Sequence, residues 1–319
     1  MLTTRLAAGM IPVGIIVVGA GVVAGQDYPN KPIRIITGSA GASIDVGARL
    51  LAQGFTVNMG QQVIVDNRPV IFGAEAVAKA PPDGYTLLMS GPTLWVGPLL
   101  QNTSHDPTKE FSPITLLSMQ PNVLVLHPSV PASTVKELIA LAKARPGELN
   151  YGSSGIGGSP QLAAELFKAM AGVNITRVDY KGTAPAKIAL MSGEVQLMIV
   201  PGGTVMTYAK SGRLRALAVT SAQPSALVPG LPTIAASGLP GYESVSMVGM
   251  MAPAKTPATI INRLNLEIVR ILNRTDIKQK FFDSGVETIG SSPQEYAVKL
   301  KSDNATMGKV IKDAGIHAE

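Results

Sequence analysis

A glycine- and serine-rich stretch is the part of this sequence best suited to bind a ligand: Tyr151-Gly152-Ser153-Ser154-Gly155-Ile156-Gly157-Gly158-Ser159-Pro160. Leu149 to Tyr151 reads as a short strand, and Ser159 and Pro160 are typical of the N-cap and the first position of a helix. A strand, a small-residue loop and a helix N-terminus leave several backbone N–H groups unpaired, with the positive end of the helix dipole behind them. This arrangement suits an anion such as a carboxylate or a phosphate.

The stretch alone does not define one function. After Gly155 and Gly157 the third glycine of a dinucleotide-binding fingerprint is replaced by Pro160, and no Lys-Ser/Thr pair follows as in a P-loop. Ordinary turn chemistry remains the alternative, because glycine and serine are common between strands and helices.

Similar loops follow other predicted strands. Gly38 to Ser43 follows a strand at 31–37, Gly91 to Trp95 follows one at 85–90, Lys181 to Thr183 precedes a helix, and Pro201 to Thr204 follows a strand at 195–200. In an open parallel sheet such loops meet at the carboxyl edge, where ligands bind. The predicted ligand-binding residues are therefore Ser39, Ser43, Asp45, Thr93, Ser153, Ser154, Gly157, Ser159, Thr183 and Gly202.

Asp45 is the one acidic residue of this set. An ionised Asp45 repels a carboxylate, so its candidate roles are to orient a water, to fix the loop, or to accept a hydrogen bond from a ligand hydroxyl or amine. The alternative is a purely structural role, in which Asp45 is a favourable negative charge in the first turn of a helix that Ser43 caps. Trp95, the only tryptophan, is either a core residue or part of the cleft wall.

Strands alternate with helices along the chain, which predicts an α/β fold with mostly parallel sheets. The apolar passage from Ile114 to His127, interrupted at Gln120-Pro121-Asn122, reads as two strands joined across a domain boundary. A second such passage from Tyr242 to Met251 reads as the return. We therefore predict one lobe from residues 27–118 and 246–319, with the final helix packed back on it, and a second lobe from 119–245.

Composition excludes several classes of protein. The 319 residues contain no cysteine and only three scattered histidines, His105, His127 and His317, so we expect no disulfide, metal site or cofactor. An apolar run from Leu6 to Ala24 after Arg5 predicts a cleavable signal peptide over residues 1–25, with a permanent membrane anchor as the alternative. Without Arg5 the net charge is 26 − 21 = +5, dispersed and with 4% aromatic residues, which argues against nucleic-acid binding.

A series of different short motifs extends from Tyr28 to the C-terminal region. They are Tyr28-Pro29, Lys31-Pro32-Ile33-Arg34, Asn67-Arg68-Pro69, Gly73-Ala74-Glu75-Ala76-Val77-Ala78-Lys79, Pro82-Asp83-Gly84-Tyr85-Thr86-Leu87-Leu88, Asp106-Pro107, Phe111-Ser112-Pro113, Pro121-Asn122-Val123-Leu124-Val125, His127-Pro128, Leu149-Asn150-Tyr151, Ser153-Ser154-Gly155, Tyr180-Lys181-Gly182, Gly212-Arg213-Leu214-Arg215-Ala216-Leu217-Ala218-Val219, Leu231-Pro232-Thr233 and Gly238-Leu239-Pro240-Gly241. Together they resemble the substrate-binding proteins of tripartite tricarboxylate transporters, the Bug family of periplasmic solute receptors.

This resemblance implies a two-lobed, clamshell periplasmic binding protein of type II. It further implies a monomer that captures a small organic acid and delivers it to integral membrane permease subunits, and that holds the carboxylate through backbone N–H groups and ordered waters. The sequence departs from the family pattern at Ile44, where Ser or Thr is usual, and at Val70-Ile71-Phe72, which replaces a glycine-rich loop. Gln196 and Val200-Pro201 also replace acidic or amide residues of many members.

Two other functions are alternatives to a transport receptor. An exported serine hydrolase would need an activated nucleophile, yet no Gly-x-Ser-x-Gly elbow occurs and no histidine lies in a candidate cleft loop. A ligand-loaded sensor module that docks on a membrane histidine kinase has the same sequence features as a transport receptor.

Overall fold

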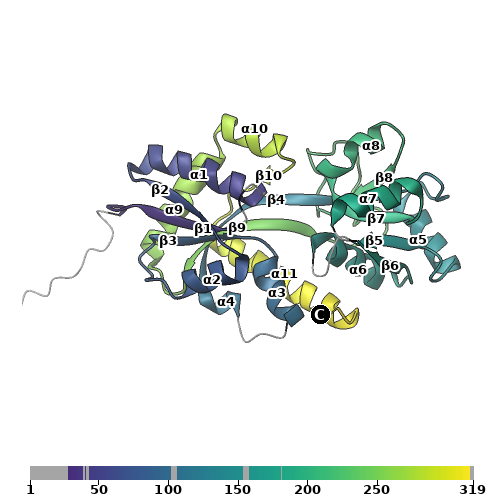
Figure 1. Cartoon of the computed structure of the whole chain (residues 1–319), viewed down its shortest axis with the longest axis horizontal. Helices are drawn as coiled ribbons and strands as arrows, with labels where there is room; N and C mark the ends of the chain where they lie inside the picture. Colours follow the sequence, from purple (N-terminus) through teal and green to yellow (C-terminus); the bar gives the residue numbers. More distant parts are fainter. Residues whose placement is uncertain are drawn as a thin grey trace, which may run out of the picture.

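The computed structural model describes residues 28–38, 40, 43–101, 106–153, 158–180 and 182–316. The predicted signal peptide at 1–25 lies outside these residues and stays a prediction. Two α/β lobes lie side by side, and two long strands run between them (Figure 1). The predicted fold class is therefore confirmed, whereas the exact lobe boundaries remain a proposal.

The first lobe is built on strands that alternate with helices. Its strands are β1 (Ile33–Thr37), β2 (Val63–Asn67) and β3 (Thr86–Ser90), with the short β10 (Glu287–Thr288) added late in the chain. β1 pairs in parallel with both β2 and β3, as predicted. The helices of this lobe are α1 (Ser43–Met59), α2 (Val70–Ala78), α3 (Thr93–Gln101), α4 (Pro107–Glu110), α9 (Ala258–Leu272) and α10 (Thr275–Asp283).

The second lobe repeats this alternation of strands and helices. Its strands are β5 (Asn150–Ser153), β6 (Thr176–Asp179), β7 (Leu197–Pro201) and β8 (Arg215–Val219). β5 is parallel to β6 and to β7, so the carboxyl ends of these three strands lie at one edge. The helices are α5 (Val135–Ala144), α6 (Ser159–Ala171), α7 (Thr183–Ser192), the 3-10 turn η1 (Gly202–Thr204) and α8 (Met206–Lys210).

One continuous strand, β4 (Phe111–Leu126), joins the lobes, so the prediction of two separate strands is wrong. Pro121 does not interrupt it because the strand changes partners there. Pro121 lies opposite Val245 of β9 (Val245–Pro253), and Asn122 lies opposite Pro201 of β7. Proline has no N–H to donate to a neighbouring strand, so a sheet accepts it where the pairing is already interrupted. The change of partner from β9 to β7 is such an interruption.

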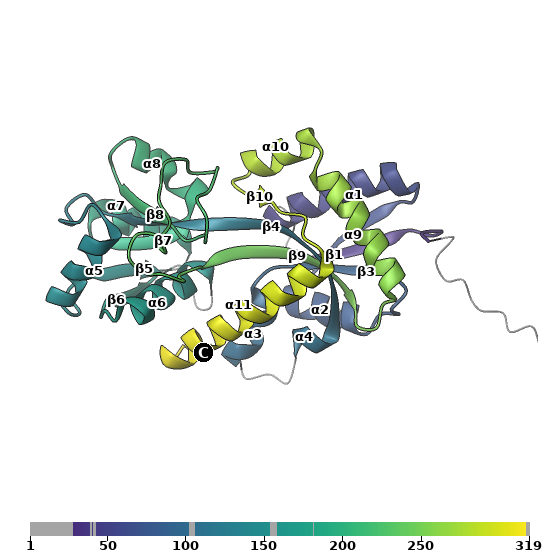
Figure 2. The ribbon, with the colours of Figure 1, turned by 180° about the vertical axis from the view of Figure 1, so that it is seen from behind.

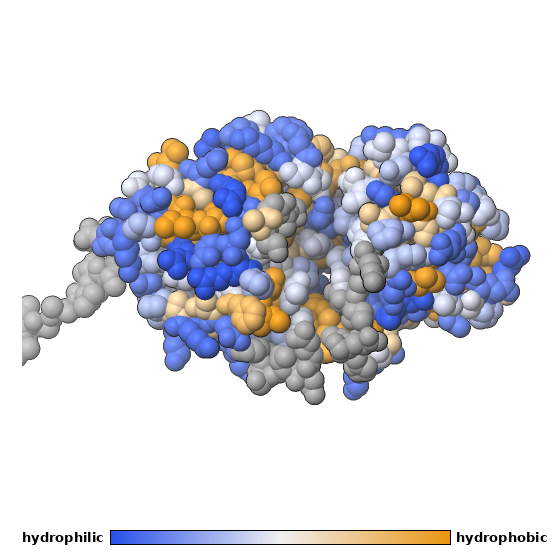
Figure 3. Space-filling view, in the orientation of Figure 1, coloured by the Kyte–Doolittle hydropathy of each residue, from blue (hydrophilic) through white to orange (hydrophobic). Residues whose placement is uncertain are grey.

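The orientation of β4 brings the two carboxyl edges face to face. In the first lobe β9 is antiparallel to β3 and to β4, with Ser90 opposite Gly249 and Ser246 opposite Gln120. In the second lobe β7 is antiparallel to β4 and ends opposite Asn122. The strand ends of both lobes therefore point toward residues 120–122, and the molecule is hollowed between the lobes (Figure 3).

The final helix, α11 (Pro293–Asp313), begins with the predicted capping box, in which Ser292 and Glu295 satisfy each other's backbone N–H groups. It packs on β4 and α3 of the first lobe, as predicted, and also on α6 of the second lobe. We call β4 and β9, the paired strands that run from one lobe to the other, the crossing strands. The rear view shows α11 running along the underside of the crossing strands toward the second lobe (Figure 2).

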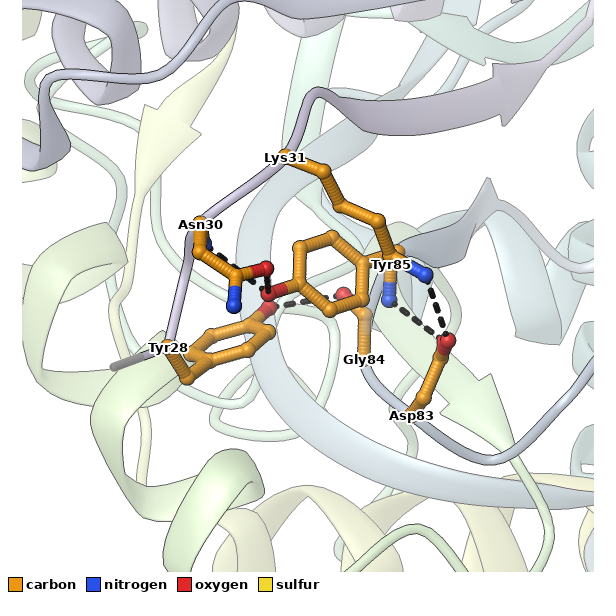
Figure 4. A network of polar contacts seen from close by, with 6 residues as sticks. All are labelled: Tyr28, Asn30, Lys31, Asp83, Gly84 and Tyr85. Atoms are coloured by element: carbon orange, nitrogen blue, oxygen red, sulfur yellow. Dashed lines mark hydrogen bonds and ion pairs between the residues drawn. The ribbon is translucent and has the colours of Figure 1, made fainter. Parts of the chain in front are cut away.

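The chain enters the first lobe at the edge opposite the gap. Tyr28 donates a hydrogen bond from its hydroxyl to the Gly84 carbonyl over 2.7 Å, and Lys31 pairs with Asp83 at 3.1 Å (Figure 4). The Tyr28 and Tyr85 rings meet edge to face with centroids 5.0 Å apart, and burial raises the pKa of the Tyr28 hydroxyl. This network fixes the amino ends of β1 and β3, away from the loops at their carboxyl ends.

In the described part of the chain, no helix combines the length and apolar character needed to cross a bilayer.

Candidate functional site

The loop after β1 is held by a buried carboxylate. Asp45 is 3% exposed; its Oδ1 accepts a hydrogen bond from Asn67 Nδ2 at 2.9 Å, and its Oδ2 pairs with Arg49 Nε at 3.1 Å. The same Asn67 amide also donates to the Gly38 carbonyl at 2.8 Å, so it ties the end of β1 to the start of α1. Of the predicted roles for Asp45, this geometry favours fixing the loop.

Two serines of this loop were also predicted to bind the ligand. Ser39 lies outside the described residues. Ser43 is the first residue of α1 rather than the residue before it, so the helix begins one position earlier than the predicted cap implies. Its side chain lies outside the described part of the molecule.

Thr37, at the last position of β1, was missed by sequence reasoning. It is 2% exposed, and its Oγ1 has no hydrogen-bond partner among the described residues. An unpaired buried hydroxyl is costly in a folded protein and points to a group that a ligand or a water satisfies.

The loop after β3 is shorter than predicted, because Thr93 already begins α3. Gly91 and Pro92 make the turn, and their carbonyls accept the N–H groups of Leu94 and Val96. Thr93 lines a groove between α2, α3 and α4. Trp95 is a core residue, 1% exposed, whose Nε1 donates to Asp303 Oδ2 of α11 at 2.7 Å.

β5 ends at the edge of the second lobe that faces the gap. Ser153 ends β5, is completely buried, and its Oγ has no hydrogen-bond partner in the described ranges. Ser154 and Gly157 fall outside those ranges. Gly158, not Ser159, is the N-cap of α6, because the Ser159 hydroxyl instead accepts a hydrogen bond from Asn122 Nδ2 at 2.9 Å.

Asn122 is the second residue that sequence reasoning missed. It is completely buried in β4 between the two lobes, and its Oδ1 lacks a hydrogen-bond partner within the described chain. Its backbone N–H is satisfied by Thr220 Oγ1 at 2.8 Å. The interruption at Gln120-Pro121-Asn122 was the available signal, but it was read only as a break in a strand.

The last two predicted residues begin short elements of the second lobe. Thr183 is the first residue of α7, after Gly182, whose φ of 104° is left-handed and requires a glycine. Gly202 begins η1 at the end of β7, and a side chain there would meet Val123 and Val228 at 3.1–3.2 Å. Both lie at the carboxyl edge of the second lobe, as predicted.

Helix starts from different lobes meet below the crossing strands. Pro92 before α3, Ser159 of α6 and Ser244 before β9 line one small cavity together with Asp303. Burial raises the pKa of the Asp303 carboxyl against the opposing influence of the Trp95 N–H and Lys299. Among the residues placed by the structure, no group of three His, Asp or Glu side chains is arranged to hold a metal.

Two α/β lobes, two strands that connect them, and facing strand ends with buried hydroxyls that have no partner among the described residues form the architecture of a periplasmic-type binding protein. Residues 47–316 match the model of the tripartite tricarboxylate transporter family receptor. The chain therefore belongs to this family of periplasmic solute-binding receptors, as the sequence motifs indicated.

Individual relatives agree with this assignment. Protein BugT of Bordetella pertussis is 33% identical over 322 residues, covering 98% of this chain and 98% of BugT. The structure of R. palustris Rpa4515 with adipate is 36% identical, covers 91% of this chain and 99% of its own, and has a TM-score of 0.71. A TctC solute-binding protein from Polaromonas without ligand is 26% identical, covers 90% and 99%, and has a TM-score of 0.83.

Proposed function

We propose that this protein captures a small carboxylate between its two lobes and delivers it to a tripartite tricarboxylate-type membrane permease, without chemical turnover. The observation that carries the proposal is a pair of buried hydroxyls without a partner in the described ranges, Thr37 Oγ1 and Ser153 Oγ, at facing strand ends of the two lobes. A hydroxyl donates readily to an anionic oxygen, and a donor from each lobe makes ligand binding and lobe closure one event.

Asn122 completes this set with different chemistry. Its unpaired Oδ1 is an acceptor, so it suits a ligand hydroxyl or an ordered water rather than the carboxylate itself. The N-termini of α6 and α7, both at the carboxyl edge of the second lobe where β5 ends at Ser153, supply backbone N–H groups there.

The permease partner and the export of the chain are part of the proposal. Membership in a transporter receptor family supports the partner, and the apolar segment at 6–24 supports cleavage of a signal peptide. A serine hydrolase would need a histidine in the cleft to activate its nucleophile. His127 instead lies beyond the outer end of β4, where its Nδ1 is 2.7 Å from Ser129 Oγ, and this position supports binding without turnover.

An open arrangement of the lobes is consistent with the comparisons. The ligand-free Polaromonas protein has the higher TM-score, 0.83 against 0.71, although its identity is lower, 26% against 36%, than that of the adipate-bound protein. A shape closer to a ligand-free receptor supports a gap that closes on binding.

The proposal is tested with purified protein and a panel of mono-, di- and tricarboxylates in a thermal-shift screen. A ligand at 100 times its dissociation constant is expected to stabilise the protein by about 2.7 kcal/mol, which appears as a raised melting temperature. The outcome that contradicts the proposal is a melting temperature unchanged by every acid in the panel, together with hydrolysis of ester or amide substrates.

Two variants localise the binding. Ser153→Ala and Thr37→Val remove unpaired hydroxyls with little change in volume, so each is expected to leave the ligand-free stability unchanged or slightly higher. Each should weaken carboxylate binding about tenfold, equivalent to about 1.4 kcal/mol. Ser211→Ala, whose exposed hydroxyl only caps a carbonyl of its own turn, is the matched control that should change neither property.

A further inference from the structure

A second hollow adjoins the candidate site on the upper side of the crossing strands. Its floor is made by two cross-strand pairs, Ser118 opposite Val248 and Gln120 opposite Ser246, from β4 and β9. The first turns of α1 form one wall and the end of α10 forms the other. We call this hollow the α1–α10 pocket.

The walls of the α1–α10 pocket are apolar. Ile44, Val46 and Leu50 come from α1, and Phe281 and Val286 come from α10 and the segment after it. Phe281 is 5% exposed and belongs to the core, whereas Val46 is 42% exposed and lies at the mouth. A hydrocarbon group placed here would be removed from water on several sides.

None of the described residues that line this pocket carries a charge. Its polar groups are hydroxyls and the Gln120 amide, and the Gln120 Nε2 already donates to the Gly285 carbonyl at 3.3 Å. Transfer of a second ionised group from water into such surroundings is strongly unfavourable, because no opposite charge would compensate it.

The pocket is close enough to the carboxylate site for one ligand to occupy both. Ile44 of the pocket wall lies against the loop after β1, because a Cβ on Gly38 would be 3.5 Å from Ile44 Cγ2. Gly38 directly follows Thr37, and one residue of extended chain spans about 3.3 Å, which is within the length of a short hydrocarbon chain.

We propose that the α1–α10 pocket binds the uncharged hydrocarbon end of the ligand, so that the receptor selects monocarboxylates with an apolar body over di- and tricarboxylates. This proposal rests on the proposed function, because it assumes that the carboxylate lies between the lobes. It assigns the substrate class of that site through residues that do not contact the carboxylate.

Titration calorimetry with straight-chain monocarboxylates of increasing length tests the proposal. Affinity should rise about fourfold per added methylene, corresponding to ~0.8 kcal/mol, until the pocket is filled. Succinate and citrate should bind at least tenfold more weakly than the best monocarboxylate. Equal or tighter binding of succinate or citrate would overturn the pocket assignment and leave the receptor function standing; no binding of any acid would contradict the receptor function itself.

A matched pair of variants on α1 locates the effect. Val46→Thr places a hydroxyl at the pocket mouth, while Val57→Thr makes the same change on the same helix at a residue that is 76% exposed and outside the pocket. Val46→Thr should lower affinity for the longest acids severalfold and leave acetate binding unchanged, and Val57→Thr should change neither. Equal effects of the two variants, or an unchanged chain-length dependence in Val46→Thr, would show that the hollow is only a packing gap between α1 and α10.

Discussion

The two sides of the crossing strands β4 and β9 differ in chemistry. On the side of α1 and α10 the strands carry uncharged residues and border an open pocket. On the opposite side α11 covers them, with Trp95 bonded to Asp303 and Lys299 paired with Glu243. The strands thus form the floor of a binding gap on one side and the packed base of the molecule on the other, which explains how one α11 can contact both lobes without entering the gap.

The largest effect is expected where α11 meets the strands. A Cβ on Gly249 would lie 2.1 Å from the ring and hydroxyl of the fully buried Tyr296, so Gly249→Ala should lower the free energy of unfolding by about 3 kcal/mol. Gly97→Ala is the control, because a Cβ there meets no described atom within 4 Å and alanine favours the helix by about 0.5–1 kcal/mol. Urea unfolding measures both; equal stability of the two variants would mean that α11 does not pack tightly on β9.

Trp95→Phe sharpens the comparison on the same side. It removes the N–H that Asp303 accepts and should cost about 2 kcal/mol of stability, because a buried carboxylate loses its donor. Circular dichroism is the suitable probe, since Trp95 is the only tryptophan. Carboxylate affinity should be unchanged, and a large loss of affinity would place this side in contact with the ligand.

Asp45→Ala gives the converse result on the open side. It removes the ion-pair partner of Arg49 and one of two acceptors of the Asn67 amide, which keeps its bond to the Gly38 carbonyl. We expect a loss of only about 1 kcal/mol in stability, because Arg49 is largely solvent-exposed. Affinity for a carboxylate should fall about tenfold, equivalent to about 1.4 kcal/mol, as the loop after β1 loses its support. Calorimetry checks this; unchanged affinity would show that Asp45 is only a stabilising charge in the first turn of α1.

The smallest effect concerns pH. Burial raises the folded-state pKa of Asp303, so the folded protein holds this proton more tightly than the unfolded chain. Wild type should therefore lose stability relative to Asp303→Asn as pH rises from about 4, the unfolded pKa, through the higher folded pKa. Urea unfolding at several pH values measures the difference, and a constant difference would contradict the assigned burial effect.

The sequence predicted the local elements well because they depend on local signals. Ser292-Pro293-Gln294-Glu295 marked the start of α11, and Pro-Gly turns marked strand ends. The single strand β4 was not predictable, since Pro121 is tolerated only because the neighbouring strands change at that point, which is a tertiary property.

The candidate site was predicted in part for the same reason. Ser153 was found because small residues follow it, whereas Thr37 and Asn122 lie within apolar strands and resemble ordinary strand residues. Ser159 was given the wrong local role, because its true partner, Asn122, is 37 positions away in the chain. Val70-Ile71-Phe72, which replaces the glycine-rich loop of the family pattern, forms the first turn of α2, with Pro69 as its N-cap.

The central claim is that a carboxylate lies between the facing strand ends of the two lobes. A crystal structure with the tightest-binding acid from the screen tests it most directly. We predict that the carboxylate accepts hydrogen bonds from Ser153 Oγ and Thr37 Oγ1, with the lobes closer together. Density for the acid in the groove between α2, α3 and α4, with neither hydroxyl in contact with it, would contradict the account.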